Sequence, residues 1–271
     1  MTDERRPLTV TDILRRKAQH ERLVVLTCYD ALFARLLDEC DVDILLVGDS
    51  VNQVLAAAET TLSATLDQMI YHTRIVRRGT TRAMVVCDMP FLTYQVSPEE
   101  AVRNCGRVMA QTGCHAVKLE GGQQMAPTVR ALVDVGIPVM GHIGLTPQSV
   151  HALGGYRVQG RDDKTAERLR ADARALEDAG AFAIVLELLP SPLATDISKM
   201  LTIPTIGIGA GPGCDGQVLV LHDMLGLNDR FSAKFVKHYA KLADTVRDAV
   251  RRYGDDVRGG RYPGSEHSFE K

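Results

Sequence analysis

The stretch from Val42 to Ser50, VDILLVGDS, constrains the fold more than any other part of the chain. Its first six residues are mostly branched and apolar, which is typical of a strand buried on both faces, as in a parallel sheet covered by helices. Gly48 breaks this run, and the polar pair Asp49 and Ser50 follows. Because α/β folds place their chemistry just beyond the carboxyl ends of strands, this pair is a candidate for a functional site.

The same pattern, an apolar run followed by a helical pattern, recurs about eight times along the chain. The strands that it predicts are 23–29, 42–48, 83–87, 116–120, 137–141, 182–186, 204–208 and 217–221. The helices that we expect are 9–19, 31–40, 65–79, 97–113, 125–136, 162–180, 192–201 and 232–253. Eight such units in roughly 250 residues indicate an α/β fold, a (β/α)8 TIM barrel, more than the alternative of an open doubly wound sheet. We therefore expect one domain over residues 1–271, with a short N-terminal helix that could plug the barrel and with a C-terminal helix and tail.

Composition excludes several classes of protein. Hydrophobic residues make up 45% of the chain and charged residues 24%, which is ordinary for a globular protein with a large core. The net charge of −2 provides no basic field for nucleic acid or an anionic membrane. The N-terminus has no apolar signal segment and no run reaches membrane-spanning length, so we expect a cytoplasmic protein. The six cysteines show no CxxC pair or zinc-type spacing, which predicts buried free thiols in a reducing compartment.

Polar residues lie at or just beyond the carboxyl ends of most predicted strands, namely Asp30, Asp49, Asp88, Glu120, His142, Glu187 and Asp223. In a closed barrel these ends form a ring around one axis. Carboxylates that converge there repel one another unless a cation lies among them or some are protonated. Oxygen ligands without a cysteine partner favour Mg²⁺, so the ring predicts a magnesium site at the barrel mouth.

Several of these residues also have a purely structural interpretation. Asp30 directly precedes a helix and is more simply explained as its N-cap, and Asp223 also fits a structural role better. His142 fits a structural and a functional histidine equally well. Glu187 lies in an apolar stretch, VLELLP, which suits a general base, with an ion pair as the alternative. Lys118 shares the side of its strand with Glu120, so it either faces inward beside the acids or outward to solvent.

The glycines of GIGAG, residues 207–211, allow two interpretations. A glycine-rich turn after a barrel strand can cradle a phosphate. No G-K-[ST] follows, and no third glycine is in register for a dinucleotide fingerprint. Tight packing of the backbone at the barrel rim is therefore the favoured explanation.

A series of ordered motifs spans nearly the whole chain. They are VGDS (47–50), YHTRIVRRG (71–79), CDMPF (87–91), VKLEGG (117–122), GHIGLTPQSV (141–150), GGYRVQGR (154–161), LELLP (186–190), GIGAG (207–211), DGQVLVLHD (215–223) and YPGSEHSF (262–269). Together they closely resemble the ketopantoate hydroxymethyltransferase (3-methyl-2-oxobutanoate hydroxymethyltransferase) family.

This resemblance implies a one-carbon transferase of pantothenate biosynthesis. It would move a hydroxymethyl unit from 5,10-methylenetetrahydrofolate to 3-methyl-2-oxobutanoate through a Mg²⁺-stabilised enolate, giving 2-dehydropantoate (ketopantoate). It also implies a homo-oligomer, with a decamer common, and the long C-terminal helix could serve packing between subunits. The alternatives are a Mg²⁺-dependent C–C lyase or mutase of the phosphoenolpyruvate mutase/isocitrate lyase type, which would need no folate, and a barrel that only binds keto acids or partners.

The resemblance also implies roles for residues at the predicted mouth. Asp49 in VGDS and Asp88 in CDMP match metal ligands, and Glu120 in VKLE matches the third acidic position at the metal. Asp49, Ser50, Asp88 and Lys118 match positions that bind the substrate. The folate site has no matched residues beyond the expectation that it opens on the same face of the barrel.

Glu187 in LELLP matches the proton acceptor of the family. A 2-oxo acid can chelate Mg²⁺ through its carboxylate and keto oxygens, and the cation then stabilises the enolate formed when C3 loses its proton. One stretch departs from the family pattern: in NQVLAAA, residues 52–58, a glycine is expected near Ala57. The detailed shape of the loop after Ser50 is therefore left open.

Overall fold

The computed structural model describes residues 6–229 and 233–269. The chain divides into two compact units, residues 1–220 and 221–271, which we describe separately. The prediction that residues 1–271 form one domain stays a prediction.

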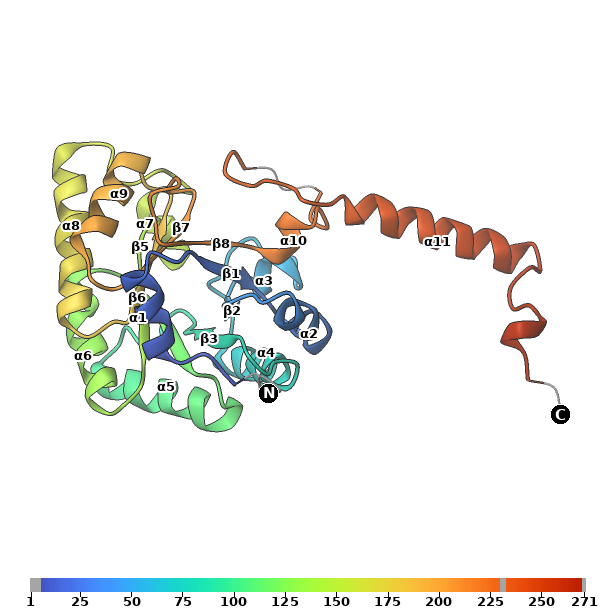
Figure 1. The fold of residues 1–271 in the computed structure, drawn as a ribbon, viewed down its shortest axis with the longest axis horizontal. Coiled ribbons are helices and arrows are strands. Elements are labelled where there is room, and N and C mark those ends of the chain that lie inside the picture. The colour runs from blue at the N-terminus through green and yellow to red at the C-terminus, as the bar shows by residue number, and fades with distance from the viewer. Residues whose placement is uncertain (1–5, 230–232, 270–271) are drawn as a thin grey trace. The chain divides into compact units, whose positions relative to one another are not determined.

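Eight parallel strands close into a barrel in the first unit, and their order around the barrel is their order in the sequence (Figure 1). The strands are β1 (Leu23–Thr27), β2 (Ile44–Val47), β3 (Met84–Asp88), β4 (Ala116–Glu120), β5 (Val139–Gly144), β6 (Ala183–Glu187), β7 (Thr205–Ile208) and β8 (Gly216–Leu219). Parallel pairing of β8 with β1 closes the ring. The predicted (β/α)8 barrel is confirmed.

Helices connect the strands around the outside of this barrel (Figure 1). They are α2 (Ala31–Glu39), α4 (Leu66–Arg78), α5 (Pro98–Thr112), α6 (Ala126–Asp134), α8 (Asp163–Asp178) and α9 (Ser191–Met200). Shorter elements lie in the loops: α3 (Val51–Val54), α7 (Val150–Leu153), and the 3₁₀ turns η1 (Gln123–Met125) and η2 (Pro147–Ser149). The side chains of Thr65, Ser97 and Asp162 cap α4, α5 and α8, because each accepts a backbone N–H that the first helical turn leaves without a partner.

The helix α1 (Val10–Ala18) covers the amino end of the barrel, as predicted. Its residue Ile13 is fully buried in one apolar cluster with Leu23 and Ile44, the first residues of β1 and β2. Burial of a side chain of this size stabilises the fold by roughly 1.5–3 kcal/mol. A capping box formed by Thr9 and Asp12 fixes where the helix begins.

The structure corrects two boundaries that bear on function. β5 extends through His142 to Gly144, so His142 lies inside the strand and not after it. The flanking glycines interrupt the apolar pattern of β5, but the ladder to β6 continues as far as the pair Gly144 and Glu187. β2 begins at Ile44, later than predicted, and the side chain of Asp43 before it pairs with Arg16.

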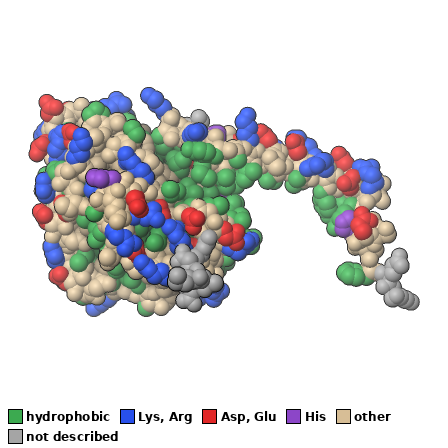
Figure 2. Space-filling model, in the orientation of Figure 1, with side chains coloured by type: hydrophobic (Ala, Val, Ile, Leu, Met, Phe, Trp, Pro, Cys, Tyr) green, Lys and Arg blue, Asp and Glu red, His purple; other side chains and the backbone are tan. Residues whose placement is uncertain are grey.

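The surface and the cysteines also bear on the sequence-based expectations. Lys, Arg, Asp and Glu side chains are interspersed on the visible face of the barrel unit (Figure 2). All six cysteines are free thiols, and five are buried, but Cys40 at the end of α2 is exposed. None of the helices described here is both long enough and apolar enough to span a membrane.

The second unit contains α10 (Leu221–Met224), α11 (Leu242–Arg258) and the 3₁₀ turn η3 (Ser265–His267). The long helix predicted at 232–253 begins at Leu242 instead, and its predicted first residue, Ser232, lies outside the described residues. None of the residues of α11 is buried within the chain.

Candidate active site

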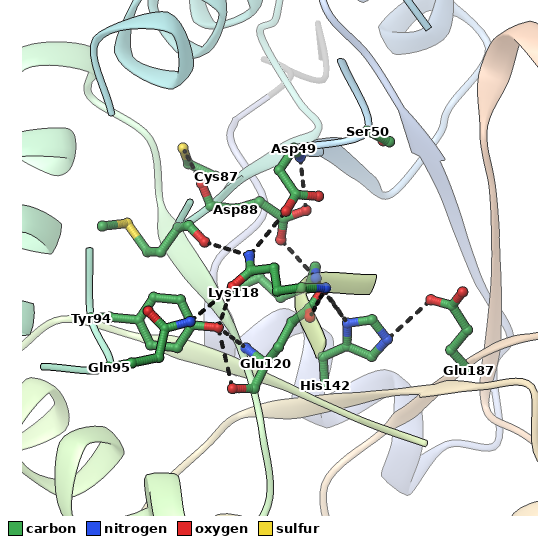
Figure 3. A network of polar contacts seen from close by, with 12 residues as sticks. Asp49, Ser50, Cys87, Asp88, Tyr94, Gln95, Lys118, Glu120, His142 and Glu187 are labelled. Atoms are coloured by element: carbon green, nitrogen blue, oxygen red, sulfur yellow. Dashed lines mark hydrogen bonds and ion pairs between the residues drawn. The ribbon is translucent and has the colours of Figure 1, made fainter. Parts of the chain in front are cut away.

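A cluster of buried polar side chains lies at the carboxyl ends of β2 to β5 (Figure 3). Its members Asp49, Asp88, Lys118, Glu120 and His142 are each between 3% and 6% exposed. Asp49 follows β2, Asp88 ends β3, Lys118 and Glu120 belong to β4, and His142 belongs to β5. The predicted convergence of Asp49, Asp88 and Glu120 at one mouth of the barrel is therefore confirmed.

Lys118 is the cation at the centre of this cluster. Its register partner across the β3–β4 ladder is Asp88, so the two side chains leave the sheet on the same side. The Lys118 Nζ atom lies 2.8 Å from Asp88 Oδ1 and 3.1 Å from His142 Nδ1. Burial opposes the charge of Lys118, but the carboxylates of Asp88, Glu120 and Asp49 raise its pKa above the ordinary value. The inward-facing interpretation of Lys118 is correct.

The three carboxylates crowd one another. The backbone N–H of Asp49 donates to Asp88 Oδ2 at 3.1 Å. Burial, and then repulsion from Asp88 and Glu120, raises the pKa of Asp49 to about 8. Burial also raises the pKa of Asp88, against the opposing effect of Lys118. Burial opposes ionisation of Glu120 as well, but the contacts with His142 and the charge of Lys118 keep its pKa below the ordinary value. The cluster therefore contains more carboxyl groups than cationic side chains, and the repulsion between them favours an additional cation.

His142 connects the cluster to Glu187, the last residue of β6. Its Nδ1 atom lies 3.3 Å from Glu120 Oε1, and its Nε2 atom lies 3.1 Å from Glu187 Oε2 (Figure 3). Because the Lys118 ammonium can only donate, Nδ1 accepts from it in the neutral ring, and the ring proton is on Nε2. Burial and Lys118 oppose a second proton, but Glu120 and Glu187 hold the pKa of His142 above its ordinary value. In either protonation state a proton on Nε2 faces Glu187.

Glu187 lies at the edge of the cluster, with its side chain 15% exposed and directed toward an imidazole. The stretch VLELLP suggested apolar surroundings for Glu187, but its carboxylate in fact faces the His142 ring. The next residue, Leu188, has a φ of 48°, a left-handed conformation that costs a non-glycine residue energy and often occurs at functional sites. A Cβ atom at Gly144 would clash with the carbonyl oxygen of Glu187. Both features constrain the backbone from which the Glu187 side chain extends.

Ser50 lies next to Asp49 and is only partly buried. Its Oγ atom is 2.8 Å from the hydroxyl of Tyr29, a buried residue that follows β1. A Cβ atom at Gly48 would lie 2.6 Å from Ser50 Oγ, so the glycine leaves room for this hydroxyl. The predicted substrate-contacting serine is thus held at the rim of the cluster.

Two further members of the site, Gln148 and Tyr94, were not singled out from the sequence. The Gln148 side chain donates to Asp49 Oδ2 at 2.9 Å, and its backbone N–H donates to Glu120 Oε2 at 3.0 Å. The Tyr94 hydroxyl accepts from the backbone N–H of Glu120 at 3.0 Å. The available signal was a polar residue in the loop after β5, within the motif GHIGLTPQSV.

Other candidates do not join the cluster. Asp30 accepts the backbone N–H groups of Leu32 and Phe33, both at 2.9 Å, and is the N-cap of α2. Asp223 belongs to the second unit, where it accepts from the side chain of Asn228 at 3.0 Å. In GIGAG, a Cβ atom at Gly207 would lie 2.9 Å from Cys214 Sγ, which favours tight packing over a phosphate cradle.

The donor set suits a hard cation, because Asp49, Asp88 and Glu120 offer only oxygen atoms. Within residues 6–229 and 233–269, no three His, Cys, Asp or Glu side chains are arranged as a ready-made metal cage. Lys118 and Gln148 instead engage oxygens of the carboxylates. A magnesium ion commonly binds through one or two carboxylates and keeps several waters, and this mode fits the residues present.

The fold and the site define a (β/α)8-barrel protein with a buried acidic cluster and a lysine at its mouth. The family model described as ketopantoate hydroxymethyltransferase matches residues 7–265. A 3-methyl-2-oxobutanoate hydroxymethyltransferase from Pelobacter propionicus is 56% identical over 269 residues, which cover 99% of this chain and 100% of that protein. The protein of the same name from Syntrophus aciditrophicus is 53% identical over 264 residues, 97% of each chain. The chain therefore belongs to the ketopantoate hydroxymethyltransferase family, and it is a hydroxymethyltransferase.

Solved structures with a similar fold come from more distant proteins. A phosphonopyruvate hydrolase in complex with oxalate and Mg²⁺ has a TM-score of 0.62 at 12% identity, covering 96% of this chain and 93% of its own. A 2,3-dimethylmalate lyase, described as a member of the phosphoenolpyruvate mutase/isocitrate lyase superfamily, has a TM-score of 0.59 at 17% identity, covering 97% and 92%. At these identities the likeness shows a shared fold.

Proposed function

We propose that the enzyme transfers a hydroxymethyl unit from 5,10-methylenetetrahydrofolate to 3-methyl-2-oxobutanoate and forms 2-dehydropantoate for pantothenate biosynthesis. The observation that carries this proposal is the buried cluster, in which three acids and a lysine lie beside a histidine that faces Glu187. The names of the curated relatives, which match nearly the whole chain, support the same substrate.

In this proposal, Asp49 and Asp88 would hold Mg²⁺, with Glu120 as the third acidic residue of the site. When bound, the ion supplies electron withdrawal from the keto acid and stabilises the negative charge that develops there. The excess of buried carboxylates supports a cation at this place. The presence of Mg²⁺ and oxalate in a phosphonopyruvate hydrolase of similar fold agrees with it.

The remaining residues bind the keto acid and move its proton. Lys118 and Ser50 attract the negatively charged end of the substrate, Lys118 by charge and Ser50 through its hydroxyl at the rim. Glu187 accepts the proton from C3, and the Nε2 proton of His142 holds the Glu187 carboxylate in place. The carbon that loses the proton then forms a bond to the methylene carbon of the folate. The bonds from that carbon to the folate nitrogens break, water supplies the hydroxyl oxygen of the new hydroxymethyl group, and tetrahydrofolate leaves.

Replacement of Glu187 with glutamine tests this assignment. Glutamine keeps the shape of the side chain but cannot accept the proton, so we expect Mg²⁺ and keto-acid binding to persist while exchange of the C3 hydrogen falls by about 10²–10⁴-fold. Exchange is followed by NMR in deuterium oxide, without folate. Glu39→Gln, at an exposed glutamate of α2 that pairs with Arg35, is the matched control. Wild-type exchange in Glu187→Gln would remove Glu187 from this role.

A second function, a Mg²⁺-dependent C–C lyase or mutase, is favoured by one observation, the shared fold with such enzymes. Turnover that requires folate supports the transferase, and turnover of a keto acid without folate supports the lyase. A barrel that only binds keto acids would exchange no C3 hydrogen. The cytoplasmic location, the homo-oligomer and the decamer stay predictions.

A further inference from the structure

Gln148 contacts the acidic cluster through both its side chain and its backbone, although the proposed reaction gives it no role. It lies in η2, the turn after β5, and is 6% exposed. Its side-chain Nε2 donates to Asp49 Oδ2 and to the carbonyl oxygen of Met89, both at 2.9 Å. Its backbone N–H donates to Glu120 Oε2 at 3.0 Å. Gln148, in the loop after β5, therefore contacts both Asp49, which follows β2, and Glu120, which ends β4.

The orientation of this amide is determined by its surroundings. The carboxylate of Asp49 and the carbonyl of Met89 can only accept, so the NH₂ group must face them. The Oε1 atom on the other side accepts from the Tyr94 hydroxyl at 2.8 Å and from Gln95 Nε2 at 3.0 Å. All the bonds of the amide agree with one orientation, so rotating it would leave donors facing donors.

The hydrogen bonds from the side chain and the backbone of Gln148 each engage only one of the two oxygens of a carboxylate. Gln148 holds Oδ2 of Asp49 and Oε2 of Glu120. The other oxygens, Asp49 Oδ1 and Glu120 Oε1, are left for other partners, and Glu120 Oε1 lies 3.3 Å from His142 Nδ1. A neutral donor of this kind orients buried acids without cancelling the charge that attracts a cation. Partners that orient metal-binding side chains in this way strongly affect metal affinity.

We propose that Gln148 is a positioning residue that orients the carboxylates of Asp49 and Glu120, so that the oxygens it does not bind face a divalent cation. Gln148 acts through these two carboxylates and contacts neither the ion nor the keto acid. The proposal rests on the proposed function, because it assumes that the acidic cluster is where the cation binds.

Binding of Mn²⁺, a spectroscopic substitute for Mg²⁺, tests the proposal without turnover. The free-ion signal in electron paramagnetic resonance gives the Kd of the whole protein without keto acid. In Gln148→Met, which keeps the volume but loses the amide, we expect the Kd to rise about tenfold or more. Gln148→Asn, whose shorter amide cannot reach both Tyr94 and Asp49, should show a rise of similar size. Thermal melts identify which variants are folded.

Gln123→Met is the matched control, because Gln123 lies in the loop after β4 and its amide contacts Asp172, which is not part of the cluster. Its Kd for Mn²⁺ should stay within about twofold of the wild type, since it orients none of the carboxylates. A folded Gln148 variant with a wild-type Kd would overturn the positioning role alone. If wild-type protein bound no Mn²⁺, the proposed function would fail instead, so the two failures are distinguishable.

Discussion

Ala57 has a backbone conformation that favours glycine. Its φ of 55° lies in the left-handed region, which costs an L-residue with a Cβ atom about 1–2 kcal/mol. It lies at the place where the family pattern led us to expect a glycine, in the loop after Ser50. The loop therefore keeps a glycine-like conformation although the glycine is missing, and the strain is local because the side chain is exposed.

Replacement of Ala57 with glycine should stabilise the protein. Glycine removes the strain of the left-handed conformation and loses part of that gain through the greater entropy of its unfolded chain, which leaves a net increase of up to about 1 kcal/mol in the free energy of unfolding. Urea unfolding measures the change. Ala56→Gly is the control, because Ala56 is also exposed but has no positive φ, and it should lose stability. A lower stability of Ala57→Gly than of the wild type would contradict this account.

The amino ends of the strands are held by side chains that bind the backbone. Asp38 of α2 accepts the backbone N–H groups of Thr81, Arg82 and Ala83, directly before β3. His115, directly before β4, accepts the backbone N–H of Val85 on its Nδ1 atom at 2.8 Å. The register of β3 and β4 brings Asp88 opposite Lys118, so these contacts position the active-site pair from the other end of the strands.

The surroundings of His115 lead us to expect that the stability of the protein depends on pH. Burial, and then the charge of Arg77, lowers the pKa of His115 from 6.5 to about 4. The unfolded state therefore binds more protons between these values, and the contribution of His115 is complete above pH 6.5 and is lost as the pH falls toward 4. Urea unfolding at several pH values should show this loss in the wild type.

His115→Asn isolates this contribution, because the asparagine oxygen can accept the Val85 N–H but does not titrate. The difference in unfolding free energy between wild type and variant should shrink or reverse sign as the pH falls from 6.5 to 4. An ordinary pKa for His115 in the folded protein, measured by NMR, would rule this explanation out.

In the molecule as a whole, α11 is an amphipathic helix whose apolar face is largely exposed, although the ring of Tyr253 on this face contacts that of Tyr262. Val246, Val250, Tyr253 and Val257 follow the helical repeat on one side and are between 45% and 62% exposed. A contiguous exposed apolar face of this kind is typical of a surface that binds another protein. It agrees with the expectation that this helix packs between subunits of a homo-oligomer.

A charge on this face should therefore weaken assembly. We expect Val250→Asp to shift the protein to smaller species in size-exclusion chromatography with light scattering, because a buried, unpaired carboxylate in an interface is costly. Arg251→Ala changes the net charge by the same amount on the other side of the helix and should leave assembly unchanged. Equal masses for Val250→Asp and wild type would show that α11 is not an interface.

Local patterns were enough to predict most of the fold. Apolar runs and helix ends depend on neighbouring residues, so the strands, the helices that start at Thr65, Ser97 and Asp162, and the end of α5 at Gly113 follow from the sequence. The predicted start of α11 was wrong, because residues 233–241 carry a helical pattern but are not helical: apart from a turn at 234–235 and a bend at 239, they have no regular structure.

The sequence by itself determined that the acids at the strand ends meet, because the closure of eight parallel strands brings their carboxyl ends together wherever they lie in the chain. Only the tertiary structure decided how the side chains pair. The amide of Gln148 meets Asp49 across 99 residues, and His142 faces Glu187 from inside a strand. Such pairs depend on distances of a few tenths of an ångström and on which oxygen each donor selects, and no local pattern of residues encodes that choice.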